Sequence, residues 1–452
     1  MRNAGRWKRR AEAQRRPSLD PAAADGGSVE VVVDRLGARG DGIARAPDGR
    51  RLYVAGSLPG ERLRVHVGAA HGDGFAAGIA EILMPSPERA DPPCPHFGRC
   101  GGCSLQHLQD EAYLGWKLDR LTAALARAGF AGYELQPVVR VAPGERRRAT
   151  FSAERGAATG ARAGSPVRLG FTEARSHAVA DLATCLVLEP RIVAVLPALR
   201  ALLADVLAPG QRTRAVVSLL DGGLDLVLDL PEPPGPELFE RLAGFAHEAD
   251  VARLSWRQGA LAPAEPVVQR RPVHALFAGV PVAVPPGSFL QATARGEAAL
   301  GDVVRSATSG AGHAADLFAG VGTFALPLAA VGLRVHAVDA DGPAVDALAR
   351  AARGNPRITT ERRNLFARPL SAEELGRFDA VVFDPPRAGA KAQAQALAAS
   401  AVPVAIAVSC NPDSFVRDAR VLAAGGFRLA SLTPVDQFLW SAHLELAAVF
   451  VR

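Results

Sequence analysis

The feature that most constrains this 452-residue sequence is the alternation of apolar strands with helical segments from residue 293 to the end. Short runs of β-branched or small apolar residues are separated by stretches of helical periodicity. This alternation indicates an α/β domain with a doubly wound, Rossmann-like sheet. The last two runs follow each other closely, which favours an antiparallel hairpin at the sheet edge. The expected strands are Ala314–Phe318, Arg334–Val338, Arg357–Glu361, Phe378–Phe383, Val402–Val408, Phe427–Pro434 and His443–Val451.

Glycines and carboxylates follow the ends of these expected strands. Gly320 and Gly322 follow the first strand and let the backbone approach a nucleotide-type ligand closely. Asp339 ends the second strand, where a carboxylate can accept hydrogen bonds from ribose hydroxyls. Asp384 precedes two prolines at the end of the fourth strand, although an aspartate there can also be a helix cap. The combination favours an S-adenosylmethionine site over a dinucleotide site.

A cysteine follows the fifth expected strand. Cys410 lies between the apolar run Val402–Val408 and Pro412, which can begin a helix reaching about Gly425. Amide groups at such a strand-to-helix junction favour the thiolate, the nucleophilic form of cysteine. A lone cysteine is more often a small core residue, so the neighbouring motifs decide its interpretation.

The N-terminal region predicts a small barrel behind a basic arm. Residues 1–27 are arginine-rich and then rich in Ala, Gly and Pro, which predicts a disordered arm able to lie along nucleic-acid phosphates or simply a solvated tail. From residue 28 to 84, five short alternating runs predict an OB-like β-barrel. Asp48 and Gly49 indicate a hairpin between two of these strands.

Four of the five cysteines form a set between residues 85 and 292, the expected central α+β region. A proline- and glycine-rich loop holds three of them, and the fourth follows about eighty residues later. Four thiolates with this spacing suit an iron–sulfur cluster or a structural zinc ion. The region also predicts helices near Glu189–Ala208 and Glu237–Glu248 and a hairpin closed at Asp221. The four cysteines are Cys94, Cys100, Cys103 and Cys185.

Three blocks of the C-terminal region, in order and spacing, resemble the signatures of the RNA uracil-5-methyltransferase family. They begin at Asp384, Ser409 and His443 and read Asp-Pro-Pro-Arg-Ala-Gly, Ser-Cys-Asn-Pro and His-Leu-Glu. The expected barrel is similar to a TRAM domain, and the four cysteines are similar to that family's 4Fe–4S pattern. The resemblance covers nearly the whole chain after the arm and is strongest to the branch that acts on 23S ribosomal RNA.

The resemblance implies roles for individual residues. Cys410 would be the nucleophile, and Glu445 the base that removes the C5 proton, facing Cys410 across the sheet end. Phe289 and Arg387 would contact the substrate, and the four cysteines would hold a 4Fe–4S cluster. Residues 293–452 would form the methyltransferase domain. The residues implied to contact S-adenosylmethionine are Gln291, Phe318, Gly320, Asp339, Asn364 and Asp384.

Some positions depart from the family pattern, and three rival interpretations remain. Thr293 stands where the family usually has Asn, Asp339 where it has Glu, and Asn364 where an acidic residue is common. The three alternative interpretations are a transfer-RNA uridine C5 methyltransferase, an amino-directed RNA methyltransferase and a non-catalytic iron–sulfur RNA-binding protein. An amino-directed enzyme needs an aromatic residue where this chain has Arg387, and it needs neither Cys410 nor Glu445.

Charge and hydropathy add only weak constraints. The formal net charge is +6, and residues 1–16 alone carry seven basic groups and one acidic group, so the remainder is close to neutral. No apolar run approaches the length of a membrane span, and the N-terminus has no apolar signal core. We therefore expect a cytoplasmic protein that does not bind membranes. The resemblance implies that its partner is RNA, and we expect a monomer.

Overall fold

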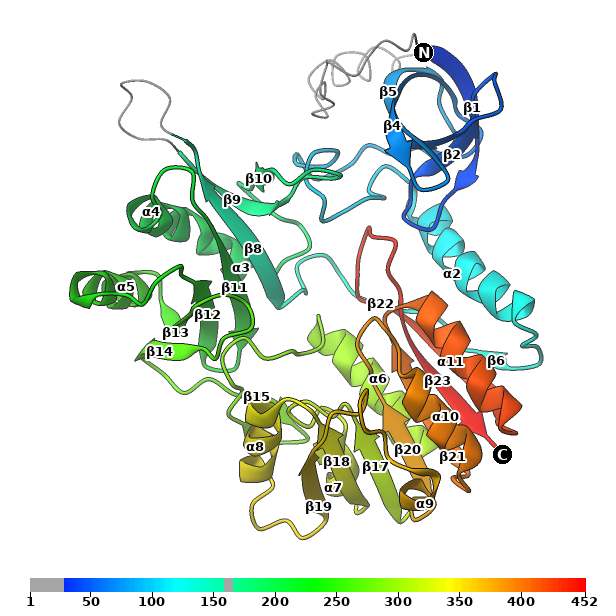
Figure 1. Ribbon diagram of the computed structural model, residues 1–452, viewed down its shortest axis with the longest axis vertical. Coiled ribbons are helices and arrows are strands. Elements are labelled where there is room, and N and C mark those ends of the chain that lie inside the picture. Colours follow the sequence, from blue (N-terminus) through cyan, green and yellow to red (C-terminus); the bar gives the residue numbers. More distant parts are fainter. Residues whose placement is uncertain (1–27, 158–165) are drawn as a thin grey trace. The chain divides into compact units, whose positions relative to one another are not determined.

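The computed structural model describes residues 28–157 and 166–452, which divide into two compact units (Figure 1). Of the described residues, 28–120, Gly170–Leu182 and Trp440–Ala442 belong to the first unit, and the others belong to the second. The expected basic arm, residues 1–27, lies outside the described residues. Helix α2 (Asp110–Arg127) holds residues of both units.

The first unit is built around a closed five-stranded barrel, as the sequence predicts. Its strands follow the order β1-β2-β3-β5-β4, and Leu52, Val54, Leu63 and Val65 are fully buried inside it. Gly49 adopts a positive φ of 86° in the expected hairpin between β2 and β3. The strands are β1 (Val29–Leu36), β2 (Gly42–Arg45), β3 (Arg51–Val54), β4 (Arg62–His71) and β5 (Gly74–Met84).

A second element of the first unit is the short antiparallel pair formed by Gly170–Thr172 and Val179–Asp181. These residues belong to β9 (Val167–Thr172) and β10 (Val179–Asp181). The cysteine-bearing loop contacts this pair, because Gly101 donates a backbone hydrogen bond to the carbonyl of Thr172 at 2.9 Å. A side chain at Gly101 would meet that carbonyl oxygen at 2.7 Å, so the close approach requires glycine.

The second unit begins with a mostly antiparallel sheet and its helices. The expected hairpin joins β11 and β12, whereas β12 and β13 are parallel. The helix expected over Glu189–Ala208 is divided into α3 and α4 at Val195. The elements are β8 (Arg148–Arg155), α3 (Pro190–Ala194), α4 (Leu196–Val206), β11 (Arg212–Leu220), β12 (Gly223–Asp229), α5 (Pro236–Glu248), β13 (Val251–Arg257), β14 (Glu265–Gln269), β15 (Ala275–Phe277) and β16 (Val280–Val282).

The C-terminal part of this unit is the expected doubly wound sheet. The order is β19-β18-β17-β20-β21-β23-β22-β6, with parallel pairing from β19 to β21. The strands are β6 (Glu134–Leu135), β7 (Val139–Arg140), β17 (His313–Leu317), β18 (Arg334–Asp339), β19 (Ile358–Arg362), β20 (Ala380–Phe383), β21 (Val404–Ser409), β22 (Arg428–Asp436) and β23 (Glu445–Val451).

The last two strands form the expected antiparallel hairpin, but not at the sheet edge. Strand β23 is inserted between β21 and β22 and is antiparallel to both. Strand β22 then pairs in parallel with β6 and β7, which come much earlier in the sequence. This pairing gives hydrogen-bond partners to backbone N–H and C=O groups on the other edge of β22.

Apolar side chains cover both faces of this sheet. Helices α6, α7 and α8 supply one cluster, which includes Leu300, Leu326 and Leu348, and helices α9, α10 and α11 supply the other, which includes Leu397 and Leu422. Figure 1 shows α10 and α11 side by side. The helices are α6 (Ala294–Ala307), α7 (Ala325–Ala330), α8 (Gly342–Ala351), α9 (Ala372–Leu375), α10 (Lys391–Ala399) and α11 (Pro412–Ala424).

Candidate active site

Cys410 lies at the junction between β21 and α11, as the sequence predicts. Asn411 is the N-cap of α11, and its side-chain oxygen accepts a hydrogen bond from the amide of Asp413 at 3.1 Å. The amide group of Asn411 donates to the carbonyl of Arg387 at 3.0 Å, which ties this junction to the loop after β20. Cys410 itself is half-buried.

The strand register places Glu445 beside Cys410. The last paired residues of β21 and β23 are Ser409 and Leu446. In an antiparallel ladder, the next position along one strand lies opposite the preceding position of the other, so Cys410 and Glu445 come next. The two residues therefore occupy the same end of the sheet on adjacent strands.

A chain of buried and partly buried hydrogen bonds joins two carboxylates near this position. Gln291 Nε2 donates to Asp384 Oδ2 at 2.8 Å. Gln437 Nε2 donates both to Gln291 Oε1 and to Glu445 Oε2, each at 2.9 Å. Gln291, Gln437 and Glu445 are at most 3% exposed. Residues that are widely separated in the sequence are thus joined into one polar cluster.

Burial dominates the electrostatics of this cluster. It raises the pKa of Asp384, against the hydrogen bond from Gln291. It also raises the pKa of Glu445, with a further contribution from the charge of Asp384 and an opposing one from Gln437. A carboxyl group whose pKa lies above its ordinary range can exchange a proton near neutral pH, as a general base must.

The fold gathers groups around Cys410 that oppose the thiolate form which the nearby amides were expected to favour. Burial, then the charges of Glu445 and Asp384, raise the pKa of the Cys410 thiol to about 11. Arg387 lowers this pKa, but by less than the other groups raise it. Burial is the largest cause because it disfavours the charged thiolate, and the two carboxylates add to it because like charges in a buried site repel each other.

The glycine turn after β17 has the geometry of a ligand-binding loop. Phe318 and Gly320 have positive φ values of 62° and 54°. The amide of Gly320 donates to Asp339 Oδ2 at 2.8 Å, and the amide of Asp341 donates to Asp339 Oδ1 at 2.9 Å. A side chain added at Gly320 would meet nothing within 4 Å, so open space adjoins this loop. The loop, its carboxylate and this space fit a nucleotide-type cofactor.

An aromatic pair lies beside the same loop. The rings of Phe318 and Phe366 are 5.5 Å apart, and Phe366 is 51% exposed. The side-chain oxygen of Asn364 accepts hydrogen bonds from the amides of Phe366 and Ala367 at 3.0 and 3.3 Å. Asn364 therefore shapes the turn that presents Phe366, in addition to lying where the sequence predicts a cofactor contact.

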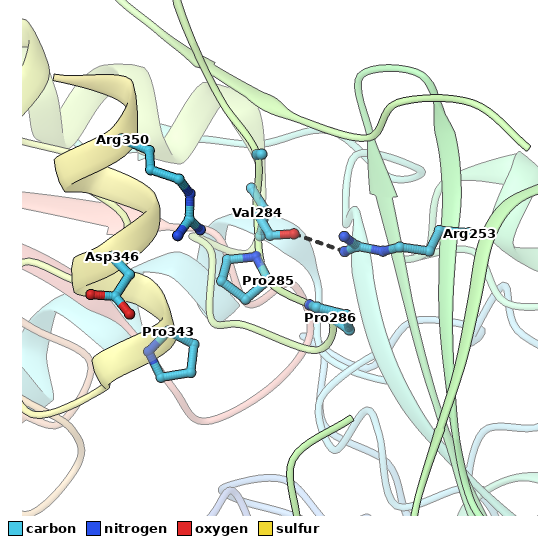
Figure 2. Close-up of a pocket in the computed structure, with 8 residues that line it drawn as sticks. Arg253, Val284, Pro285, Pro286, Pro343, Asp346 and Arg350 are labelled. Carbon is cyan, nitrogen blue, oxygen red and sulfur yellow. Dashed lines mark hydrogen bonds between the residues drawn. The ribbon is translucent and has the colours of Figure 1, made fainter. Parts of the chain in front are cut away.

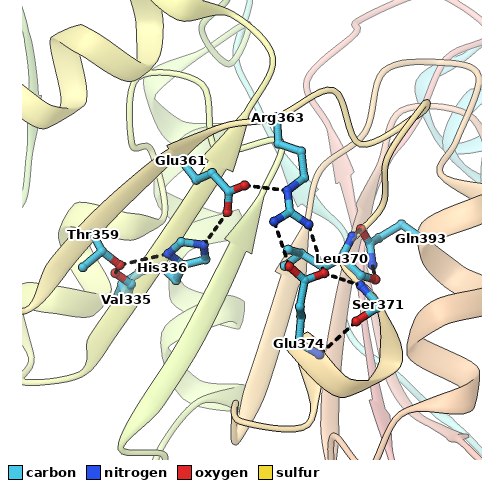
Figure 3. A network of polar contacts seen from close by, with 9 residues as sticks. All are labelled: Val335, His336, Thr359, Glu361, Arg363, Leu370, Ser371, Glu374 and Gln393. Atoms are coloured by element: carbon cyan, nitrogen blue, oxygen red, sulfur yellow. Dashed lines mark hydrogen bonds and ion pairs between the residues drawn. The ribbon is translucent and has the colours of Figure 1, made fainter.

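A polar network fixes the end of β19 that leads into this turn (Figure 3). Arg363 contacts Glu361 at 2.5 Å through Nε and binds Glu374 with both terminal nitrogens at 2.8 and 3.0 Å. His336 Nε2 lies 3.1 Å from the other oxygen of Glu361. The bidentate pair holds the pKa of Glu374 well below its usual range. This network is therefore a rigid support for Asn364 and Phe366.

The two residues predicted to contact substrate lie at the margins of the polar cluster. Phe289 is 65% exposed, and the guanidinium carbon of Arg148 lies 5.7 Å from the centre of its ring. Arg387 Nη2 lies 2.9 Å from His443 Nδ1. An exposed aromatic ring beside a cation is a surface suited to a nucleobase and its phosphate.

Gln437 is the member of this site that sequence reasoning missed. It follows β22 directly, and it is 1% exposed. Asp436 and Gln437 interrupt the apolar end of a buried strand, and this interruption is the sequence signal of a functional polar residue. Its partners Gln291 and Glu445 were predicted for separate roles, whereas the structure joins them through Gln437.

The four predicted metal-ligating cysteines are described, and all are half-buried. Cys94, Cys100 and Cys103 belong to one loop of the first unit, and Cys185 belongs to the second unit. The amide of Gly102 lies 3.4 Å from Cys100 Sγ, a donor that stabilises a thiolate. Across the described ranges, no group of three or more Cys, His, Asp or Glu side chains is arranged to hold a metal ion.

A cavity of about 410 Å³ lies elsewhere in the second unit (Figure 2). Arg253 crosses one side of it and donates to the carbonyl of Val284 at 2.8 Å and to Asp225 at 2.7 Å. Its lining combines one carboxylate with two guanidinium groups and contains none of the predicted site residues. The lining residues are Arg253, Ala283, Val284, Pro285, Pro286, Pro343, Asp346 and Arg350.

Several known proteins are similar to this chain over most of its length. It is 41% identical over 431 residues to an uncharacterized RNA methyltransferase of Caulobacter vibrioides, with 94% of this chain and 100% of that protein covered. It is 35% identical over 458 residues to the 23S rRNA (uracil(1939)-C(5))-methyltransferase RlmD of Chromohalobacter salexigens, with 98% and 92% covered. No protein-family model matches the chain.

The fold is also found among solved structures. The tRNA (uracil-54, C5)-methyltransferase of Pyrococcus abyssi, in complex with S-adenosyl-L-homocysteine, matches with a TM-score of 0.71 and 21% identity. The match covers 94% of this chain and 100% of that chain. At this identity the likeness establishes the fold.

Among the helices of residues 28–157 and 166–452, none has the length and hydrophobicity of a membrane span.

Proposed function

The chain belongs to the RNA uracil-5-methyltransferase family, and from this membership we propose that it methylates C5 of a uridine in 23S ribosomal RNA. The similarity to a 23S rRNA uracil-C5 methyltransferase over most of both chains supports this substrate. The observation that carries the proposal is the placement of Glu445 beside Cys410, with the buried hydrogen-bond chain leading from Glu445 to Asp384.

The first chemical step would be covalent addition by Cys410. Uracil C5 is a weak nucleophile, so the Cys410 thiolate adds to C6 and the electron pair of the 5,6 double bond moves toward C5. When bound, S-adenosylmethionine supplies a methyl group on a sulfonium, and this methyl group is transferred to C5. Arg387 lowers the pKa of the Cys410 thiol and so favours the attacking form.

The second step would be proton removal by Glu445. After methyl transfer, C5 carries both a hydrogen and the new methyl group. Glu445 takes the C5 proton, the electrons of that bond re-form the 5,6 double bond, and the bond from C6 to Cys410 Sγ breaks. The hydrogen bond from Gln437 supports the ionised form of Glu445, which is the form that accepts a proton.

The residues near the glycine loop would hold the methyl donor. Asp339 would accept hydrogen bonds from ribose hydroxyls, and Phe318 and Asn364 would lie near the adenine. Gln291 and Asp384 would lie at the reacting end, and Phe289 would pack near the flipped uracil. The positive φ of Gly320 and the open space beside it support this arrangement.

We further propose that Cys94, Cys100, Cys103 and Cys185 hold a 4Fe–4S cluster and that the barrel is a TRAM domain. The four-thiolate donor set and the amide donor to Cys100 Sγ support a cluster, and a structural zinc ion is the alternative. Iron and sulfide in a brownish purified protein are expected, whereas stoichiometric zinc in a colourless protein would contradict the cluster. We expect the enzyme to act as a cytoplasmic monomer.

Trapping the covalent intermediate tests the mechanism. Glu445→Gln should add to RNA and transfer the methyl group but release the product slowly, so a methylated enzyme–RNA adduct should survive denaturing electrophoresis. Cys410→Ala should form no adduct. If Cys410→Ala still methylates RNA, the covalent mechanism is wrong and an amino-directed methyltransferase has to be reconsidered.

Transfer RNA is the second candidate substrate, because the similar fold from Pyrococcus abyssi is that of a tRNA (uracil-54, C5)-methyltransferase. A deletion strain distinguishes the two candidates by mass spectrometry of its 5-methyluridine. Loss of one 5-methyluridine from 23S rRNA is expected. Loss from tRNA with an unchanged 23S rRNA map would assign the enzyme to tRNA.

A further inference from the structure

We propose that Gln437 is a positioning residue that orients the Glu445 carboxylate for proton removal and joins it to Gln291. Gln437 lies directly after β22, whose Val435 pairs with Glu445 of β23. Its side chain therefore reaches across to the adjacent strand. This inference rests on the proposed function, because it assigns to Gln437 a task in the step that Glu445 performs.

The directions of the hydrogen bonds support this task. A primary amide has two N–H groups, and Gln437 uses its nitrogen for both partners, Gln291 Oε1 and Glu445 Oε2. Gln291 in turn uses its own nitrogen to donate to Asp384. Each carboxylate thus receives an N–H donor, which is the arrangement that two ionised carboxylates require. If both glutamine amides were flipped, their oxygens would face the carboxylates, and each carboxylate would need a proton.

The carbonyl end of Gln437 is held by packing against helix α6. Gln437 Oε1 is buried and has no hydrogen-bond partner in the structure that covers residues 28–157 and 166–452. A side chain at Gly296, in the first turn of α6, would come within 2.6 Å of this oxygen. Gly296 therefore leaves room for the Gln437 side chain, which packs closely against the first turn of α6. This packing restricts the positions that the amide can adopt.

This geometry assigns different tasks to the two oxygens of Glu445. Oε2 accepts the hydrogen bond from Gln437, so Oε1 is the oxygen that takes the C5 proton. The same donor stabilises the charged form of a carboxylate whose burial favours the neutral form. Without Gln437, the carboxylate would lose this donor and would hold its proton to higher pH.

The test compares Gln437→Met with a matched control. Methionine keeps the length and volume of the side chain but cannot donate to Glu445. The control is Gln393→Met, because Gln393 is equally buried in the same unit and bonds only the backbone of Leu370. Single-turnover methylation, covalent adduct on denaturing gels, S-adenosylmethionine affinity and thermal unfolding are measured for both variants from pH 6 to pH 9.5.

Gln437→Met should lower the rate of product release at pH 7 by about tenfold to a hundredfold, the range for losing a hydrogen bond to a charged group. The pH of half-maximal rate should rise, and methylated adduct should accumulate. Gln393→Met should change neither the pH profile nor the adduct. If Gln437→Met has the pH profile and adduct level of the wild type, Gln437 has only a packing role and the inference is wrong.

Two further arms keep the outcome decisive. If Gln437→Met does not fold, Gln437→Asn carries the same test, since it keeps the amide but is one methylene too short to bridge both partners. Glu445→Gln is measured in parallel. If Glu445→Gln traps no adduct, the proposed mechanism fails. If Glu445→Gln traps the adduct but the Gln437 variants neither accumulate it nor shift the pH profile, only the present inference fails.

Discussion

The two units each bury a glutamate, and they treat it in opposite ways. In the first unit, Glu61 is fully buried, and Arg89 binds both of its oxygens, at 2.5 and 2.7 Å. The backbone amides of Leu58 and Ser86 add donors to the same two oxygens. In the second unit, Glu445 receives one neutral amide donor from Gln437 and lies near the like charge of Asp384.

The difference shows what distinguishes a structural carboxylate from one that can exchange a proton. A buried charge with a bidentate guanidinium and backbone donors is compensated by these partners, and the group then holds loops together. A buried carboxyl group without a counter-charge has a raised pKa and can take up or release a proton near neutral pH. Matched substitutions in the two units should therefore have opposite consequences.

The largest expected effect is that of Glu445→Gln on turnover. Removing the base should lower the rate of product release by about 10²–10⁴. Folding stability at neutral pH should be unchanged or slightly higher, because glutamine removes a buried ionisable group. Single-turnover kinetics and urea unfolding of the same preparation check both parts. A strongly destabilised variant would mean that Glu445 is structural, like Glu61.

Glu61→Gln should do the reverse. It leaves Arg89 buried without its counter-charge, which typically reduces the free energy of unfolding by about 3–5 kcal/mol. The single-turnover methylation rate of the molecules that remain folded should not change. As a control, the double variant Glu61→Leu with Arg89→Met should recover much of the lost stability. Equal losses in the single and double variants would contradict the pairing argument.

The free energy of unfolding should depend on pH through Asp384 and Glu445, the buried carboxyl groups that have no counter-charge. The folded-state pKa values of Asp384 and Glu445 are raised above their ordinary 3.8 and 4.5, so the folded state binds more protons than the unfolded state. Their contribution is fully present below the ordinary pKa and is lost as pH rises through the raised value.

The free energy of unfolding should therefore fall from about pH 4.5 into the neutral range, by at most about 1.4 kcal/mol per pH unit for each group. Urea unfolding across this range measures the slope for the wild type and for the double variant Asp384→Asn with Glu445→Gln. The double variant should have a flatter profile. An identical slope in both proteins would show that neither carboxyl group is protonated in the folded state.

The smallest expected effect belongs to an exposed ion pair of the barrel. Arg64 contacts Glu30 at 3.0 Å and Glu81 at 2.5 Å, but its side chain is 40% exposed. Arg64→Ala should change the free energy of unfolding by no more than about 1 kcal/mol, and the change should shrink in high salt. If Arg64→Ala reduced the free energy of unfolding as much as Glu61→Gln does, burial would not be the cause of the difference between the two ion pairs.

Local sequence patterns were sufficient for the barrel strands and for most strands of the C-terminal sheet. The barrel strands, the hairpin at Gly49, the strand before Cys410 and the helix from Pro412 follow from periodicity and from residues that begin or end elements. The resemblance of short sequence blocks to a known family led to the prediction that Cys410, Glu445, Asp384 and Gln291 are site residues. These signals are short-range, so a single sequence contains them.

The family resemblance implied that Glu445 faces Cys410, but only the tertiary structure shows the sheet order and the contacts that join the site residues. Inserting β23 between β21 and β22 brings Glu445 beside Cys410, and this insertion is a property of the sheet order. The contact of Gln437 with Gln291 joins residues 146 positions apart, and no local pattern encodes such a pairing. The raised pKa of the Cys410 thiol arises from burial and from the carboxylates gathered around it. A pKa depends on the three-dimensional arrangement of charges and solvent, and that arrangement exists only after the strands have assembled.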